Sequence, residues 1–512
     1  MGLRCSYLAF NAALGSLYED DLIQLGSRPP CEFDDTAFFD AADMVYNAGG
    51  FDASQLSTPE ARRLIAETVK QLNTAISAGV PHEVPEVVRY ALENNAFIFS
   101  GFKAFHTLRE VGLSLTTDKG DIKPFDTFRH DVEQVNNRYN HHYLYAEYNH
   151  AVGASLMAAR WQQIEADGDR YDLQYRTAQD DRVREDHAIL HGTTLPPSDP
   201  FWSLYLPPNG WNCRCTAVQV RRGKYPQSDP ALSMLRGNNC TENAKQQIFR
   251  FNPGKDLHLF PPKHPYYKAP KAAKQVIEQL SEEQKREKRI ADIIAELPAA
   301  LTADEKKTVA AHCLEIEKAL GITKGKPMSV DDADKQHSNP NYGKERGYGI
   351  NCQTCSPAYA LRLLGFNVTA KSNTPGTKLE YLSKGNQLWE QWLNLDGTPA
   401  KHTSMNDWLA AHNFQRMTPK RYIKFFEETC KETGVYMLSI GWKRGGGHAT
   451  ILQRFADGSL RYIEPQVDNS AGSGRDLDYL SKNGAATMHG CRGIMRVDNK
   501  LFNVAFAEIF DK

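Results

Sequence analysis

A long, charged stretch between residues 266 and 320 divides the sequence into two parts of different composition. Its apolar residues recur at helical spacing among many Lys, Arg and Glu residues, and Leu297-Pro298 interrupts the pattern. A chain of 512 residues is too long for one hydrophobic core. We therefore predict two folded parts joined by a charged helical connector, with boundaries at 1–265, 266–325 and 326–512.

The first part of the sequence combines two kinds of secondary structure. Up to about residue 165, apolar residues recur every three or four positions, which predicts amphipathic helices, one of them starting at Thr58-Pro59-Glu60. The segments "YDLQYR" (171–176) and "WNCRCTAVQVRRG" (211–223) then alternate between apolar and polar residues, which predicts strands. We expect a mostly helical region that carries a small α+β motif.

The composition argues against several classes of protein. The 61 Lys and Arg residues balance 62 Asp and Glu residues, so no global positive charge indicates nucleic-acid binding. Ten cysteines are far fewer than a disulfide scaffold of this length would have, which favours a reducing compartment. The N-terminus lacks the pattern of a signal peptide, and no apolar run is long enough to span a bilayer, so we expect no membrane contact.

Residues 175–220 form a long motif of polar residues, prolines and cysteines, "YRTAQDDRVREDHAILHGTTLPPSDPFWSLYLPPNGWNCRCTAVQV". The motif resembles the phage head morphogenesis family, the Mu F type of minor head protein, over about residues 90–225. The resemblance implies a virion or prophage protein, made in the bacterial cytoplasm, that lies near the portal and helps the head to assemble. Portal and capsid proteins would be its partners. The residues that carry the resemblance are Thr177, Asp180, Arg184, His187, Gly192, Pro208 and Asn212-Cys213-Arg214-Cys215.

The same motif contains four residues with the chemistry of metal ligands. His187 and His191 are four positions apart, as on one face of a helix, and Cys213 and Cys215 would point to one side of a strand. Four such side chains can coordinate zinc. A reduced cysteine pair beside hydrogen-bonded histidines is the alternative, and because C-x-C is a weaker signal than C-x-x-C, we expect that no cofactor is required.

The second part of the sequence places Cys352 and Cys355 at the start of an apolar segment that predicts a helix from about 353 to 364. A zinc site here would need a second close pair of ligands, but Cys430 and Cys491 stand alone. A redox-active dithiol would follow a strand of a thioredoxin-like unit, and the preceding residues do not read as such a strand. The remaining chemistry for one of the two cysteines is that of a nucleophile.

A cysteine nucleophile needs an imidazole to take its proton and a polar group to orient that imidazole. His448 follows a run of glycines at the head of a predicted strand, and Glu464 lies on the next strand, after a turn at Asp457-Gly458. The hairpin brings the carboxylate next to the imidazole, with Gln466 as a second candidate for the orienting role. A cysteine at a helix N-terminus also gains from the helix dipole and from backbone N–H groups that can form an oxyanion hole.

This order, a cysteine at a helix start, a histidine that leads a strand and an acid on the next strand, resembles the papain-like fold. It resembles in particular the papain-fold toxin domains of bacterial and phage polymorphic toxins, which usually have Asp where Glu464 stands. The resemblance covers about residues 326–512 and implies Cys352 as nucleophile, His448 as base and Glu464 as orienting group. The matching segments are "MSVDDADKQHSNPNY", "NCQTCSPAYALRLLGFNVTA", "GGGHAT" and "YIEPQ".

The residues themselves leave the identity of the nucleophile open between two cysteines. The resemblance favours Cys352, which directly follows Asn351. Pro357 fits best in the first turn of a helix, which would put the helix cap at Ser356 and bring Cys355 closer to it. We assign the role to Cys352.

These observations predict a multidomain protein: a mostly α-helical minor head region with a small α+β motif, a helical connector and a C-terminal α+β papain-like domain. The expected activity is hydrolysis of an amide in a host or viral protein, by a protease or a protein-glutamine deamidase, because both reactions pass through the same tetrahedral intermediate. As a toxin or effector, the domain would be delivered into a host cell and opposed by an immunity protein. The alternative is a purely structural head-assembly protein whose papain-like domain is inactive and only binds.

Overall fold

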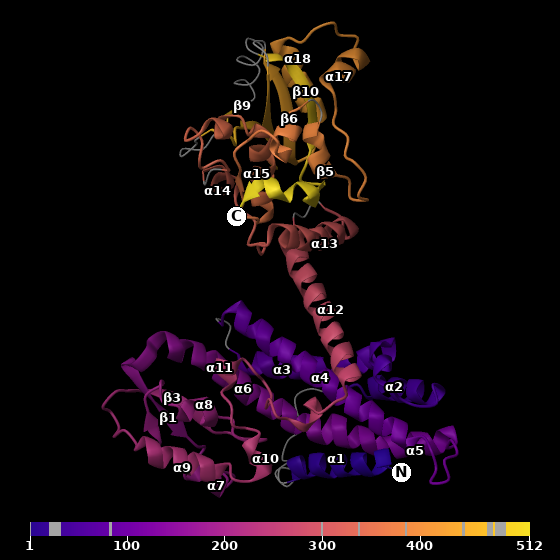
Figure 1. The fold of residues 1–512 in the computed structure, drawn as a ribbon, viewed down its shortest axis with the longest axis vertical. Helices are drawn as coiled ribbons and strands as arrows, with labels where there is room; N and C mark the ends of the chain where they lie inside the picture. The colour runs from indigo at the N-terminus through magenta and orange to yellow at the C-terminus, as the bar shows by residue number, and fades with distance from the viewer. Residues whose placement is uncertain are drawn as a thin grey trace. The chain divides into compact units, whose positions relative to one another are not determined.

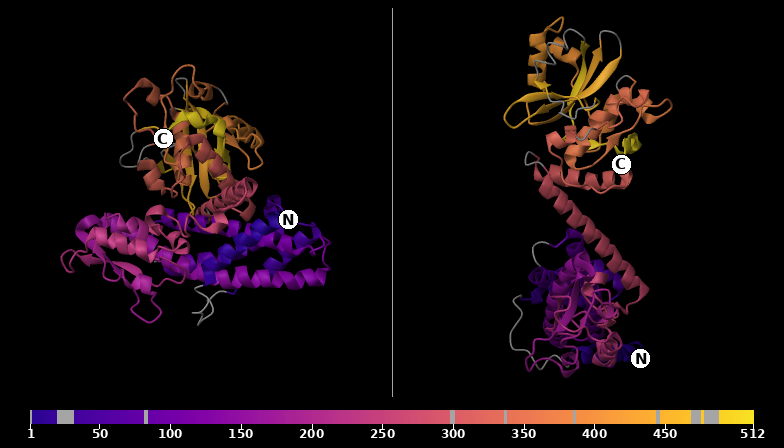
Figure 2. Two further views of the ribbon diagram at one scale, coloured as in Figure 1. Left: turned by 60° about the horizontal axis from the view of Figure 1, so that its bottom comes forward. Right: turned by 90° about the vertical axis from the view of Figure 1, so that its left-hand side faces the viewer.

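The computed structural model of the chain describes residues 2–19, 32–80, 84–297, 301–335, 338–384, 387–442, 446–467, 475–476 and 488–512. They form two compact units, unit 1 (Met1–Lys285) and unit 2 (Arg286–Lys512), and each is described on its own (Figure 1, Figure 2). Pro298 of the predicted helix break, Gly445 ahead of His448 and the side chain of Cys491 lie outside the described residues.

Unit 1 begins with helices, as the spacing of its apolar residues predicts. They are α1 (Gly2–Glu19), α2 (Asp35–Asn47), α3 (Pro59–Gly79), α4 (Glu86–Ser114), α5 (Phe125–Asn136), a π-helix (Asn137–Tyr143) and α6 (Leu144–Asp167). α3 packs between α4 and α6, and the buried faces of the helices form one core (Figure 1). The N–H of Ala61 donates to the side chain of Thr58, and Pro59 is the first residue of α3, which confirms the predicted helix start.

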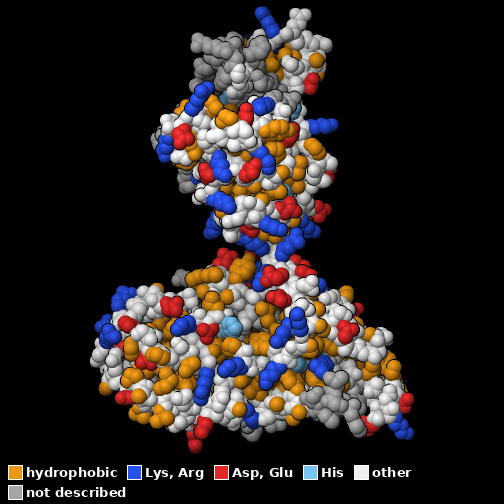
Figure 3. Space-filling model, in the orientation of Figure 1, with side chains coloured by type: hydrophobic (Ala, Val, Ile, Leu, Met, Phe, Trp, Pro, Cys, Tyr) orange, Lys and Arg blue, Asp and Glu red, His pale blue; other side chains and the backbone are white. Residues whose placement is uncertain are grey.

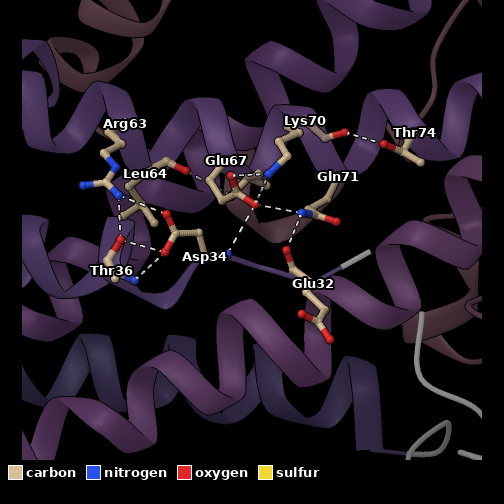
Figure 4. A network of polar contacts seen from close by, with 10 residues as sticks. Glu32, Asp34, Thr36, Arg63, Leu64, Glu67, Lys70, Gln71 and Thr74 are labelled. Atoms are coloured by element: carbon tan, nitrogen blue, oxygen red, sulfur yellow. Dashed lines mark hydrogen bonds and ion pairs between the residues drawn. The ribbon is translucent and has the colours of Figure 1, made fainter. Parts of the chain in front are cut away.

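A polar network fixes the start of α2 against α3 (Figure 4). Arg63 on α3 donates to the carboxylate of Asp34 (2.9 Å) and to the hydroxyl of Thr36 (2.6 Å). Asp34 caps α2 by accepting from the N–H of Thr36 (3.0 Å). One turn further along α3, Glu67 accepts from the N–H of Asp34 (3.3 Å) and from the side-chain amide of Gln71 (2.7 Å). The position of α2 is therefore set by directed polar contacts as well as by the apolar core.

One ion pair lies inside the core of unit 1. Nζ of Lys103 on α4 is 2.5 Å from the carboxylate of Glu147 on α6, and the two side chains are 1% and 0% exposed. Tyr18 on α1 donates a further hydrogen bond to this carboxylate (2.9 Å). Because an unpaired charge in an apolar core is costly, each member of this cluster depends on the others.

A small antiparallel sheet follows α6, in the strand order β2-β1-β3. The predicted strand "WNCRCTAVQVRRG" is shorter than expected, because β3 begins only at Thr216 and leaves Cys213 and Cys215 in the loop before it. Asn212 has a φ of 54°, a left-handed turn conformation, so the chain turns here before it becomes extended. The elements of this region are β1 (Tyr171–Arg176), α7 (Glu185–Ala188), β2 (Thr194–Leu195), α8 (Phe201–Tyr205), β3 (Thr216–Arg221), α9 (Pro230–Cys240), α10 (Ala244–Gln247) and α11 (Pro253–Asp256).

The predicted connector consists of two helices, α12 (Lys271–Glu296) and α13 (Ala303–Leu320). Ala273 and Ile277, near the start of α12, belong to the core of unit 1. Ile293, near its end, and Val309 and Ile316 of α13 belong to the main core of unit 2. The connector residues therefore contribute apolar side chains to both units.

Unit 2 is built around a five-stranded antiparallel sheet in the order β10-β6-β7-β8-β9 (Figure 2, right). α15 packs against β7, and Tyr359 of the helix shares a core with Ile451 of the strand. α17 and α18 cover a second core, in which Phe425 meets Leu452, the next residue along β7. Neighbouring residues of a strand point to opposite faces, so the sheet lies between these two cores.

The two strands that the sequence predicts around His448 and Glu464 form a hairpin in unit 2. The strand that His448 was predicted to lead is β7, which pairs with β6 on its other side. The predicted turn at Asp457-Gly458 joins β7 to β8, with the N–H of Phe455 donating to the carbonyl of Ser459 (2.9 Å). The helices are α14 (Val330–Lys335), α15 (Cys352–Leu364), α16 (Lys378–Leu382), α17 (Met405–Ala411) and α18 (Pro419–Thr429). The strands are β4 (Thr369–Ala370), β5 (Trp392–Leu393), β6 (Gly434–Trp442), β7 (Gly447–Arg454), β8 (Leu460–Ile463), β9 (Arg475–Asp476), β10 (Met488–Arg496), β11 (Leu501–Phe502) and β12 (Phe510–Asp511).

Charged side chains of both signs are mixed on the surface. On the face that Figure 3 shows, Lys and Arg side chains lie among Asp and Glu side chains over each unit, in keeping with the formal net charge of −1. Within the described ranges, no helix has both the length and the apolar composition that crossing a bilayer requires.

Candidate functional site

The candidate active site of unit 2 begins at the first turn of α15. Cys352 is the first residue of the helix, directly after Asn351. The expectation that Pro357 marks the first turn was wrong, because Pro357 lies inside the helix. A proline at this position leaves the carbonyl of Gln353 without its helical donor. The buried side-chain amide of Gln391 donates to that carbonyl instead (3.0 Å), so α15 can begin well before the proline.

A buried network around Asn351 fixes the chain just before Cys352. The side-chain amide of Asn351 donates to the carbonyl of Lys371 (2.9 Å) and to the side-chain oxygen of Asn339 (3.2 Å). Its side-chain oxygen accepts from Asn339 (3.2 Å) and from Gln466 (3.3 Å). Asn351 is fully buried. The start of α15 is therefore held by residues that are distant in the sequence.

The two cysteines of α15 have different surroundings. Sγ of Cys355 is fully buried and lies 3.3 Å from both the carbonyl oxygen and the side-chain oxygen of Asn351. Burial and the neighbouring Cys352 raise the pKa of the Cys355 thiol well above its ordinary value. Cys352 is partly exposed, and its side chain interacts with the imidazole of His448. The structure thus brings Cys352, and not Cys355, to the predicted histidine.

His448 and Glu464 form the hydrogen-bonded pair that the hairpin predicts. Nε2 of His448, near the start of β7, lies 2.6 Å from Oε2 of Glu464, which follows β8. Ile451 is opposite Ile463 in these strands, and continuing the register places Glu464 opposite Thr450, two residues from His448. Such a diagonal neighbour is within reach of a long side chain.

Glu464 is held by two further contacts. The hydroxyl of Tyr462 donates to Oε2 (2.5 Å), and the N–H of Gln466 donates to Oε1 (3.1 Å). The side chain of Gln466 turns to Asn351. Of the two candidates for orienting His448, Glu464 is therefore the one whose side chain contacts the imidazole.

Burial and neighbouring charges shift the pKa values of His448 and Glu464 in opposite directions. The two side chains are 10% and 15% exposed. Burial alone would lower the pKa of His448, but the carboxylate of Glu464 and the side chain of Cys352 raise it to about 10. Burial alone would raise the pKa of Glu464, but the imidazole of His448, the hydroxyl of Tyr462 and the N–H of Gln466 lower it. At neutral pH the pair is an imidazolium and a carboxylate.

The arrangement contains the parts that acyl transfer to a cysteine requires. Because Nε2 of His448 is held by Glu464, Nδ1 is the nitrogen that can exchange a proton with Cys352. The first N–H groups of a helix have no acceptor within the helix. Those next to Cys352 at the start of α15 can therefore stabilise an oxyanion that forms on an attacked carbonyl.

Three residues that shape this site were not predicted from the sequence: Asn339, Gln391 and Tyr462. The first two reach α15 from distant segments, and no local pattern indicates such a contact. Tyr462 is two residues before Glu464, and side chains two apart on a strand point to one side. This alternation along the strand could have predicted that Tyr462 lies next to the carboxylate of Glu464.

In unit 1, the structure brings together three of the four predicted zinc ligands. Nδ1 of His187 lies 3.5 Å from Sγ of Cys213 and 3.7 Å from Sγ of Cys215, and the three ligand atoms are within 4.8 Å of one another. His191 does not join them. Its Nδ1 accepts from the N–H (3.2 Å) and lies 3.0 Å from the hydroxyl of Thr177. The prediction of four converging ligands was wrong for His191, because α7 ends before this residue and cannot present both histidines on one face.

Comparisons with known proteins concern the part of unit 1 that contains this cluster. The sequence model of the family described as "Phage Mu protein F like protein" matches residues 123–218. The "Putative capsid assembly protein F" of Escherichia phage Mu is 41% identical over 69 residues, which are 13% of this chain and 16% of that protein. The "Mu-like prophage FluMu F protein" of Haemophilus influenzae is 38% identical over 85 residues, 15% of this chain and 20% of that protein. The chain therefore contains a Mu F-like segment.

The Mu F-like segment runs from the residues just before α5 into β3 and includes His187, Cys213 and Cys215. It confirms the resemblance to the Mu F type over these residues. The chain spans about a sixth to a fifth of the length of the two curated relatives. No solved structure matches the chain. The papain-like fold of unit 2 stays a prediction.

Proposed function

We propose that this protein takes part in phage head assembly and that its unit 2 is a cysteine-dependent amide hydrolase. The first half of the proposal rests on the Mu F-like segment and on the similarity to a protein named as a putative capsid assembly protein. Portal and capsid proteins would be its partners, and the virion its location. The second half rests on one observation: the partly exposed Cys352 at a helix start interacts with His448, which Glu464 binds.

The proposed reaction uses each member of the site in one role. The thiolate of Cys352 attacks an amide carbonyl carbon and forms a C–S bond, while the N–H groups at the start of α15 bind the oxyanion. The imidazolium of His448 gives its proton to the leaving nitrogen as the C–N bond breaks. Neutral His448 then takes a proton from water, whose oxygen attacks the thioester and releases the acid and the sulfur of Cys352. Glu464 keeps Nε2 protonated throughout.

Two classes of amide fit this chemistry, the backbone of a protein and the side chain of a glutamine. Virion and host proteins incubated with the wild-type chain and with Cys352→Ala should differ in one product, which mass spectrometry identifies. A new chain end that requires Cys352 identifies a protease. A glutamine converted to glutamate identifies a deamidase. As a toxin or effector, the domain would act on a host protein and be opposed by an immunity protein.

The control for this experiment is Cys355→Ser, which changes the neighbouring thiol and leaves Cys352 in place. Product that forms with Cys355→Ser but not with Cys352→Ala supports the hydrolase. The rival function, a head protein whose unit 2 only binds, predicts no product with any of the three chains. Mass spectrometry of purified virions tests the first half separately, because the chain should be found in the heads whether or not unit 2 is active.

A further inference from the structure

We propose that His187, Cys213 and Cys215 bind one zinc ion, with a water molecule as the fourth ligand. The site lies in unit 1, within the Mu F-like segment, and is independent of the hydrolase proposed for unit 2. Thiolate and imidazole are the ligands that zinc prefers in proteins. In this structure the three residues meet where α7 approaches the loop before β3.

The distances within the cluster agree with those around a tetrahedral zinc ion. Zinc binds imidazole nitrogen at about 2.0 to 2.1 Å and thiolate sulfur at about 2.3 Å, which separates the nitrogen and sulfur by about 3.6 Å at the tetrahedral angle. Nδ1 of His187 lies 3.5 Å from Sγ of Cys213 and 3.7 Å from Sγ of Cys215. Both nitrogen–sulfur distances are therefore close to those that a common central ion requires.

A hydrogen bond between His187 and one of the cysteines explains this arrangement less well than a shared zinc ion does. A neutral imidazole nitrogen has one lone pair and can accept a proton from one thiol only. Here two sulfurs lie at nearly equal distances from the same nitrogen of His187. His187 is 2% exposed, and its Nε2 is buried without a hydrogen-bond partner among the described residues. The ring is therefore fixed by packing, with Nδ1 aimed at the point between the two sulfurs.

The fourth coordination position has room for one water. A pocket of about 20 Å³ adjoins the cluster, which is enough for a single water molecule. Arg182, Arg184 and Arg214 also line this pocket. Arg214 is held in place by the carboxylate of Asp180 (2.6 and 2.5 Å).

Bound zinc would add to the contacts that already join these two segments, such as the hydrogen bond from Arg184 to the carbonyl of Trp211 (2.6 Å). His187 is on a helix of four residues, and the two cysteines are in a loop that is not paired with β1 or β2. The first paired residue of β3 is Thr216, directly after Cys215. A bound ion would hold the start of β3 against α7.

The proposal is tested on the full-length chain, purified without chelator after expression in zinc-supplemented medium. Elemental analysis should find one zinc per chain in the wild type and background zinc in Cys213→Ser, Cys215→Ser and His187→Ala. His191→Ala is the matched control, because His191 belongs to the same motif but not to the cluster, and it should keep its zinc. Circular dichroism checks that each variant is folded.

A second readout does not depend on the variants. Replacement of the metal by cobalt(II) in the wild-type chain should give the absorption bands of tetrahedral cobalt with thiolate ligands, and His191→Ala should give the same spectrum. Wild-type chain that contains no more zinc than the Cys213→Ser/Cys215→Ser double variant would overturn the proposal. Loss of zinc in His191→Ala, or a cobalt spectrum without thiolate bands, would overturn this ligand set.

Discussion

Replacement of Glu464 by glutamine tests the electrostatic basis of the candidate active site most directly. The pKa of His448 is raised from 6.5 to about 10, which corresponds to about 5 kcal/mol in favour of the protonated imidazole. Removal of one partner from a buried ion pair costs about 3 to 5 kcal/mol. Both partners are largely buried here, at 10% and 15% exposure. We therefore expect Glu464→Gln to lower the free energy of unfolding of unit 2 by about 3 to 5 kcal/mol near pH 6.

This loss should depend on pH in a defined direction. Because the folded state raises the pKa of His448, its stabilisation is complete below about pH 6.5 and is lost as the pH rises through about 10. The pKa of Glu464 is lowered, so its contribution is present above its ordinary value of 4.5 and is lost on acidification. The cost of Glu464→Gln should be largest near pH 6 and small near pH 10.

Urea unfolding of the full chain, followed by tryptophan fluorescence at about pH 6 and about pH 10, measures this difference. The matched control is Glu427→Gln, which breaks an ion pair with Arg454 in the same unit but leaves His448 untouched. The side chain of Glu427 is 49% exposed, so this change should cost about 1 kcal/mol or less at both pH values. Equal costs of Glu464→Gln at the two pH values would refute the pairing of Glu464 with a protonated His448.

Further predictions concern the nucleophile, the boundary of unit 2 and the core of unit 1. Iodoacetamide at neutral pH should label Cys352 well before the buried Cys355, and labelling that survives Cys352→Ala would assign the nucleophile to Cys355. A fragment that begins at residue 286 should fold. One that begins at residue 322 should be insoluble, because it lacks the apolar residues that α13 gives to the core of unit 2. A soluble, cooperatively unfolding fragment from residue 322 would contradict this boundary. Lys103→Met should destabilise unit 1 by about 3 to 5 kcal/mol, since it leaves a buried carboxylate unpaired, and a change below about 1 kcal/mol in urea unfolding would show that the pair contributes little.

Local sequence patterns predicted which helices and strands form better than they predicted where these elements begin and end. The helical spacing before residue 165 and the turn at Asp457-Gly458 were sufficient, because these features depend on neighbouring residues. The start of β3 was predicted too early. An alternating pattern does not reveal that Asn212 adopts a left-handed conformation and delays the strand. The same limit applies to His191. A spacing of four residues predicts that His187 and His191 share one face of a helix, but it does not show that α7 ends at Ala188.

The candidate site could be predicted where its residues share one hairpin. His448 and Glu464 are 16 positions apart with a turn between them, and the antiparallel register then brings their side chains together. The choice between Glu464 and Gln466 could not be predicted in this way. It depends on Asn351, whose side chain binds Gln466 and thereby keeps that amide away from the imidazole. Asn351 is 115 positions from Gln466, so no local pattern contains this contact.

The different chemistry of the two cysteines on α15 follows from where the helix begins. Pro357 would start a helix at Ser356 if only local preference acted, and Cys355 would then be the cysteine nearest the N-terminus. The amide of Gln391 binds the carbonyl that the proline leaves without a donor, so the helix extends back to Cys352. In the extended helix, the N–H of Cys355 already donates to a backbone carbonyl (3.2 Å) and its sulfur is buried, whereas Cys352 occupies the first position and faces His448. A buried amide 38 positions from that carbonyl therefore determines which thiol can act as the nucleophile.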